Sequence, residues 1–92
     1  MITRIRHRGL RRLFESGQIR GINPAHADRL RRILALLNTA NTPSDMDLPG
    51  LYLHELRGNR QGVFSVRVSG NWQVTFRIDN GDVYDVDYED YH

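Results

Sequence analysis

The chain reads FSVRVSGNWQVTFRIDNGDVYDVDY from residue 64 to residue 88, and this stretch decides the fold. Apolar side chains occupy the even positions in three successive runs, 64–68, 72–78 and 84–88. A period of two predicts β-strands that have one apolar and one polar face. Because short loops separate the runs, we expect an antiparallel meander in which even positions pair with even positions.

The requirement that even positions pair with even positions, called here the parity rule, determines the length of the loop between the last two strands. A two-residue hairpin at Asn80-Gly81 would pair Phe76 with Asp85 and place a carboxylate against the apolar face. We therefore expect a three-residue loop, 79–81, with Gly81 in a left-handed bulge. The expected pairs are Val74 with Val86 and Thr75 with Asp85.

The same rule predicts the preceding loop at 69–71, with Val66 opposite Val74 and Arg67 opposite Gln73. The other face of the sheet is then polar and, in this interpretation, open to solvent. Its expected members are Ser65, Arg67, Gln73, Thr75, Arg77, Asp85 and Asp87.

Two amphipathic helices are predicted before the sheet. The first covers residues 7–16 and ends at Gly17, and the second begins at Asn23-Pro24, an N-cap followed by proline, and ends near 38–41. Residues 2–6 suit a short edge strand, and 39–50 a loop. The predicted fold class is α+β: one domain, 1–92, with two N-terminal helices packed on one side of a curved antiparallel sheet.

Composition limits the classes of protein that remain. Ninety-two residues support one modest core, and the absence of cysteine excludes disulfides and thiolate metal sites and fits the reducing cytoplasm. No apolar run approaches the ~20 residues that cross a bilayer, and no signal peptide is recognisable, so no membrane partner is expected.

Charge is distributed unevenly along the chain. Residues 1–78 contain all 13 arginines and five acidic residues, a net charge of +8, whereas residues 79–92 contain six acidic residues and no base. There is no lysine. Arginine presents a fixed planar fork that suits phosphate, which favours a polyanionic partner such as nucleic acid, or an acidic protein. A codon bias toward arginine would explain the composition equally well.

The candidate chemistry lies at His54 and at the C-terminus, where Asp90, Tyr91 and His92 follow the last strand. Cleavage of an RNA phosphodiester needs a base for the 2′-hydroxyl proton, an acid for the departing 5′-oxygen, and cations for the charge on phosphorus. No metal pattern is present, and no cofactor is expected. The candidate phosphate-binding residues are Arg57, Arg60, Arg67 and Arg77.

Each candidate also has a structural explanation. A strand histidine such as His54 often serves packing, a terminal residue such as His92 is often disordered, and Arg67 and Arg77 would balance acids on neighbouring strands. The residues alone also leave open whether His54 or His92 is the base.

Several segments together resemble the HigB-type toxins of the RelE/ParE superfamily. They are Pro49–Arg60, within which Leu56 begins Leu-x-Gly-x-Arg-x-Gly, then Gly62–Val68, Asn71-Trp72 and the terminal Tyr91-His92. The resemblance implies a RelE-like fold and a toxin that cleaves mRNA on the translating ribosome without metal, leaving a cyclic phosphate. It implicates His54, Arg57, Asp90, Tyr91 and His92 in catalysis, and implies a helix-turn-helix antitoxin as partner.

One position departs from the family pattern. The family usually has arginine after the hairpin tryptophan, and this chain has Gln73. Two other hypotheses remain open: a non-nucleolytic gyrase poison of the ParE kind, which shares the fold, and a module that binds the ribosome or RNA without cleaving it, which the Gln73 departure supports.

Overall fold

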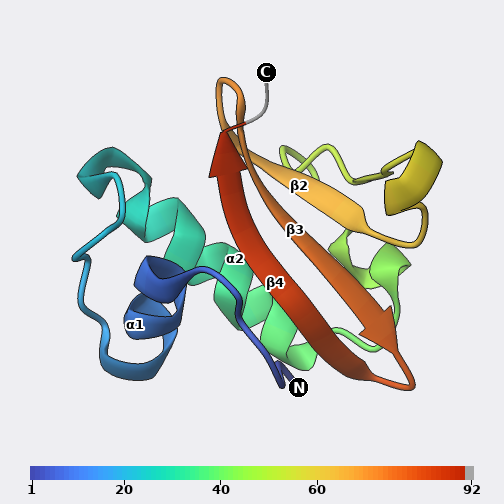
Figure 1. Ribbon diagram of the computed structural model, residues 1–92, viewed down its shortest axis with the longest axis horizontal. Helices are drawn as coiled ribbons and strands as arrows, with labels where there is room; N and C mark the ends of the chain where they lie inside the picture. The colour runs from blue at the N-terminus through green and yellow to red at the C-terminus, as the bar shows by residue number, and fades with distance from the viewer. Residues whose placement is uncertain (91–92) are drawn as a thin grey trace.

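The computed structural model describes residues 1–90 and confirms the α+β class. In Figure 1 the two helices lie together on one side of the twisted sheet, and the stretch that contains η3 lies beside β2. The four strands form one antiparallel sheet in the order β1-β2-β3-β4. The elements are α1 (Arg8–Ser16), η1 (Pro24–His26), α2 (Ala27–Thr39), η2 (Pro43–Met46), β1 (His54–Glu55), η3 (Gly58–Arg60), β2 (Phe64–Ser69), β3 (Trp72–Asp79) and β4 (Asp82–Asp90).

Both helices begin and end where the sequence predicts, for reasons of hydrogen bonding. The His7 side chain caps α1, because its Nδ1 accepts from the Leu10 backbone N–H at 3.0 Å. Gly17, at φ +76°, ends the helix and donates to the Leu13 carbonyl. The Asn23 side chain accepts from Ala25 at 2.9 Å and starts η1, which continues directly into α2.

The segment 2–6 lies along the outer edge of β4 and runs parallel to it. Ile2 bridges Val83 and Ile5 bridges Val86, and the Thr3 N–H donates to the Val83 carbonyl at 2.7 Å. The sequence predicts an edge strand here; the structure has two isolated bridges instead of a continuous strand. The pairing still covers the edge of β4 that would otherwise be open.

The predicted register between β3 and β4 is wrong. Asn80-Gly81 is a two-residue turn, so Asp79 pairs with Asp82 and Arg77 with Tyr84. In a regular strand this turn would place the Asp85 carboxylate against the apolar face. A bulge at Asp85, which adopts φ +53°, removes that conflict. Beyond the bulge, Thr75 pairs with Asp87 and Val74 with Tyr88, in place of the predicted Asp85 and Val86.

The bulge also changes which side chains of β4 reach the core. Val83, an odd position, is fully buried together with Val86, whereas Tyr84 is only half-buried. Between β2 and β3 the predicted register is confirmed, with Val66 opposite Val74 and Arg67 opposite Gln73. The loop there is one residue shorter than predicted, because Ser69 pairs with Trp72 after a second irregularity.

The polar face of the sheet is less open than predicted. Ser65, Gln73 and Thr75 are buried, and Arg77 is half-buried. The segment between β1 and β2 passes close to this face: a Cβ added at Gly62 would lie 2.8 Å from the Arg77 guanidinium. The part of this face that stays open to solvent is a groove around His54. Within residues 1–90 no helix is long and apolar enough to span a membrane.

The His7 cap predicts an acid-sensitive helix. Burial lowers the pKa of His7 below its ordinary 6.5, although the Asp87 carboxylate opposes this. The unfolded chain therefore binds a proton near that pH while folded His7 resists it, so stability should fall as the pH drops below about 6.5. Asparagine also caps a helix but does not titrate. Urea unfolding should show a smaller loss between pH 7.5 and 5.5 for His7→Asn than for the wild type.

The matched variant is His7→Ala, which removes the cap altogether. We expect it to cost about 1 kcal/mol at pH 7.5. An unchanged pH dependence in His7→Asn would contradict the proposed role of the imidazole.

Candidate active site

His54 lies on the short strand β1, opposite Ser65 on β2, and is exposed. Its Nδ1 is 3.1 Å from the Tyr52 carbonyl oxygen, and its Nε2 is 3.2 Å from the Ser65 hydroxyl. A neutral imidazole that is protonated on Nδ1 satisfies both contacts, because Nδ1 donates to the carbonyl and Nε2 accepts from the hydroxyl. In this tautomer Nε2 is the unprotonated nitrogen, and its lone pair accepts the hydrogen bond from the Ser65 hydroxyl.

His54 is shared by three adjoining hollows that together form a groove. One hollow, of about 540 Å³, contains His54 with Ser65, Arg67, Trp72 and Gln73. The other two extend past His54 to the segment that contains η3. The volume falls within the ~300–1,000 Å³ typical of ligand sites. The imidazole is therefore central in the groove and not at its margin.

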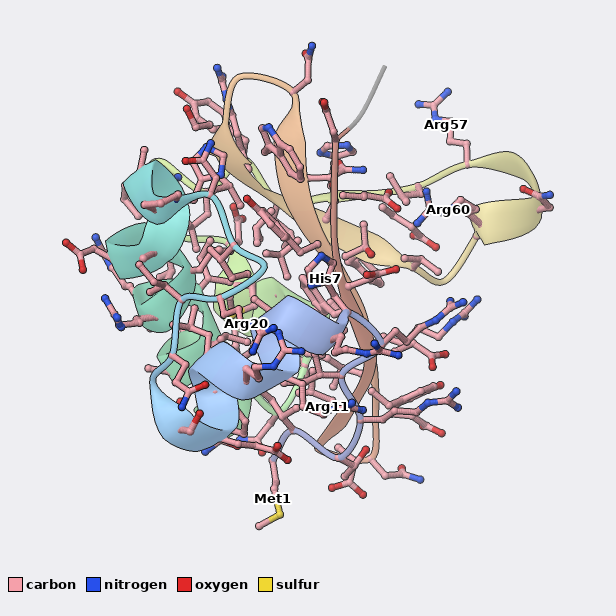
Figure 2. All side chains as sticks on the ribbon, turned by 60° about the vertical axis from the view of Figure 1, so that its left-hand side comes forward. Met1, His7, Arg11, Arg20, Arg57 and Arg60 are labelled. Carbon is pink, nitrogen blue, oxygen red and sulfur yellow. The ribbon has the colours of Figure 1, made fainter. Side chains whose placement is uncertain are left out.

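Arg57 and Arg60 both line the groove but point in different directions. Figure 2 shows Arg57 extending outward from the ribbon and Arg60 turned back toward the sheet. Arg60 forms an ion pair with Glu89 on β4, with 2.8 Å between Nη1 and Oε1. Arg57 and Arg60 thus line a different hollow from the one that Arg67 lines.

Glu89 is a site residue that the sequence analysis missed. Its Oε1 accepts from Arg60 and, at 2.9 Å, from the Gln73 amide. Burial raises the pKa of Glu89, but these two hydrogen bonds and the positive charges of Arg60 and Arg6 outweigh burial and hold it below its ordinary 4.5. Gln73 is paired directly with Glu89 across the strands. The correct register would have revealed the contact.

The other two predicted phosphate ligands are separated. The Arg67 guanidinium lies at the groove, 5.6 Å from the centre of the Tyr52 ring. Arg77 lies farther along the sheet, 3.9 Å from the Asp85 carboxylate and in contact with the Gly62 backbone region. Among the hollows around His54 described above, none is lined by Arg77.

The C-terminal candidates are only partly described. Asp90 ends β4, is exposed, and pairs with Trp72, which lines the same hollow as His54. Tyr91 and His92 lie outside the described residues. Across residues 1–90, no three His, Asp or Glu side chains are grouped closely enough to hold a metal ion.

Comparison with known proteins agrees with this architecture. Residues 3–92 match the family described as RelE-like toxin of type II toxin-antitoxin system HigB. Endoribonuclease HigB of Proteus vulgaris is 39% identical over 92 residues, which covers 100% of both chains. The class is therefore that of RelE-like toxins, as the sequence motifs indicate. Within this class, the chain belongs to the HigB-like toxins of type II toxin-antitoxin systems.

The Glu89 contacts predict a second effect of pH. A carboxyl group whose pKa is lowered on folding contributes stability above its ordinary value, here 4.5, and the contribution is lost as the pH falls through the lower folded value. Glu89→Gln should therefore be less stable than the wild type at pH 7, and the difference should shrink as the pH falls below 4.5. Urea unfolding at pH 7 and pH 3 measures the difference.

The partner variant is Arg60→Gln. If the ion pair carries the effect, the two substitutions should be non-additive at pH 7. Additive losses would show that Glu89 acts through another contact.

Proposed function

We propose that this toxin is an endoribonuclease that cuts mRNA on the translating ribosome without a metal ion. The observation that carries the proposal is the position of His54, whose imidazole lines a groove that Arg57, Arg60 and Arg67 also line. The name of the full-length relative from Proteus vulgaris, Endoribonuclease HigB, supports it.

The proposed reaction is transfer of the phosphoryl group within the RNA strand. A base removes the proton of a 2′-hydroxyl, and the 2′-oxygen forms a bond to the adjacent phosphorus. The bond from phosphorus to the 5′-oxygen breaks, and an acid protonates that oxygen. The products are a 2′,3′-cyclic phosphate and a free 5′-hydroxyl, so atoms and charge balance. Deoxyribose lacks the nucleophile, which restricts the substrate to RNA.

We assign the acid and base roles to His54 and His92, either of which is able to serve as the base. Asp90 orients a partner or accepts a proton, and Tyr91 stacks on a base or positions the 2′-hydroxyl. Arg57, Arg60, Arg67 and Arg77 are the proposed cations for phosphate; fixed guanidinium groups stabilise charge that develops in the transition state. Of these four, Arg77 alone lines none of the hollows around His54, and it is expected to act on a more distant phosphate.

The proposed partners follow from this activity. The ribosome presents the mRNA, which places the toxin in the cytoplasm when it acts. A helix-turn-helix antitoxin is the proposed inhibitor, consistent with membership of a type II system.

Primer extension on a reporter mRNA in a reconstituted translation system tests the function. Breaks should appear within codons of translated message and not in free RNA. His54→Ala and His92→Ala should each lower the cleavage rate by about 10²–10⁴-fold, because each removes one proton-transfer group. His7→Asn, another histidine replacement that preserves its helix cap, is the matched control and should retain activity.

Intact mRNA at doses of wild-type toxin that stop growth would overturn the proposal. Induction of a DNA-damage response under the same conditions would point to gyrase instead. Tight ribosome binding without breaks would identify a binding module.

A further inference from the structure

Tyr52 is the most exposed aromatic side chain among residues 1–90, with 66% of its surface open. Its backbone adopts φ +51°, a region that residues other than glycine rarely occupy. An aromatic ring that is this exposed contributes little to the core. A structural role in packing therefore does not explain why the ring is presented here.

The turn that carries Tyr52 is fixed on both sides. Leu51, immediately before it, is buried, and the Leu51 carbonyl accepts from the Arg67 N–H at 2.8 Å. From α2, the Arg29 guanidinium donates to the Gly50 carbonyl and, at 3.0 Å, to the Arg67 carbonyl. The ring thus projects from an anchored turn, which lowers the entropy that binding would cost.

A second flat group lies against the ring. The Arg67 guanidinium carbon is 5.6 Å from the centre of the Tyr52 ring, within the range of a cation–π contact. Unpaired RNA bases stack on aromatic rings and on guanidinium planes alike. The pair therefore offers an aromatic face and a guanidinium plane on which a base can stack, and a positive charge for the adjoining phosphate.

This surface is continuous with the candidate catalytic groove. Tyr52 and Arg67 line the same hollow as His54, and the Tyr52 carbonyl is one of the two groups that contact the His54 imidazole. A base held against Tyr52 would thus belong to a nucleotide close to the scissile phosphate.

We propose that Tyr52 and Arg67 form a stacking subsite for one unpaired RNA base, next to the phosphate that His54 acts on. The inference rests on the proposed function and deepens it. Stacking tolerates every base, because each has a π-face. The subsite therefore holds the strand in place and does not read its sequence. Tyr52 is a binding residue in this proposal, and the proton transfers remain with other groups.

Cleavage kinetics on ribosomes test the subsite. Tyr52→Ala should raise KM by about tenfold with little change in kcat, since base stacking is worth about 1–3 kcal/mol and tenfold is about 1.4. Tyr52→Phe should behave like the wild type, because it retains the ring. Phe14→Ala is the matched control: Phe14 is another exposed aromatic, 38% open, on α1, and its loss should leave KM unchanged.

The contacted base is identified by removing bases one at a time. In mRNAs with an abasic nucleotide at successive positions around the cut, the effect of Tyr52→Ala should disappear at a single position. A 5-iodouridine placed at that position should crosslink to Tyr52 under ultraviolet light.

The outcomes separate this inference from the proposed function. If the wild type cuts translated mRNA while Tyr52→Ala has an unchanged KM and the crosslink maps to another residue, the subsite is overturned and the nuclease stands. If the wild type does not cut but the RNA crosslinks to Tyr52, the nuclease is overturned while binding of an RNA base by Tyr52 stands. An equal effect of Tyr52→Ala at every abasic position would also overturn the subsite, because it would show a general loss of structure.

Discussion

The bulge at Asp85 is the constraint on which the rest of the sheet depends. Val83 and Val86 are both fully buried, yet residues three apart in a regular strand face opposite sides. The extra residue lets both valines face the helices. The same two residues pair with the segment 2–6, since their N–H groups donate to the Met1 and Arg4 carbonyls. The bulge therefore allows β4 to bury both valines in the core and, with the same two residues, to pair with the segment 2–6 at the sheet edge.

The positions of Glu89 and Asp90 on β4 follow from that register. Beyond the bulge, Glu89 comes opposite Gln73 and Asp90 opposite Trp72. Tyr88 anchors this end: its hydroxyl is 2.6 Å from His26 Nδ1, and its ring stacks on Trp72 at 4.6 Å between centroids. Burial raises the pKa of Tyr88, so the phenol stays neutral in this contact. The helical layer thus holds the strand end that leads to Asp90.

Local patterns allowed most of the fold to be predicted, because helix stripes, caps and strand alternation depend on neighbouring residues. The β3–β4 register was not predictable in this way, since the parity rule assumes regular strands and an Asp in a left-handed conformation has no pattern of its own. The residues of the candidate site likewise fall into a group that local sequence patterns predict and a group that they do not. His54, Arg57 and Arg60 were found from motifs, and they do lie on one groove. Ser65, Glu89 and Tyr52 depend on contacts between distant segments.

The glutamine at position 73 changes which cations a phosphate can use. The Gln73 amide and Arg60 donate to the same oxygen of Glu89, and a neutral amide leaves the carboxylate charge to Arg60. A phosphate that recruits Arg60 must therefore displace Glu89. Arg57 forms no ion pair with residues 1–90, and Arg67 contacts the Tyr52 ring, so neither faces this competition. In the proposed function, Arg57 and Arg67 are accordingly the cations expected to meet the RNA strand first, because His54 is shared by the hollow that Arg67 lines and the hollows that Arg57 lines.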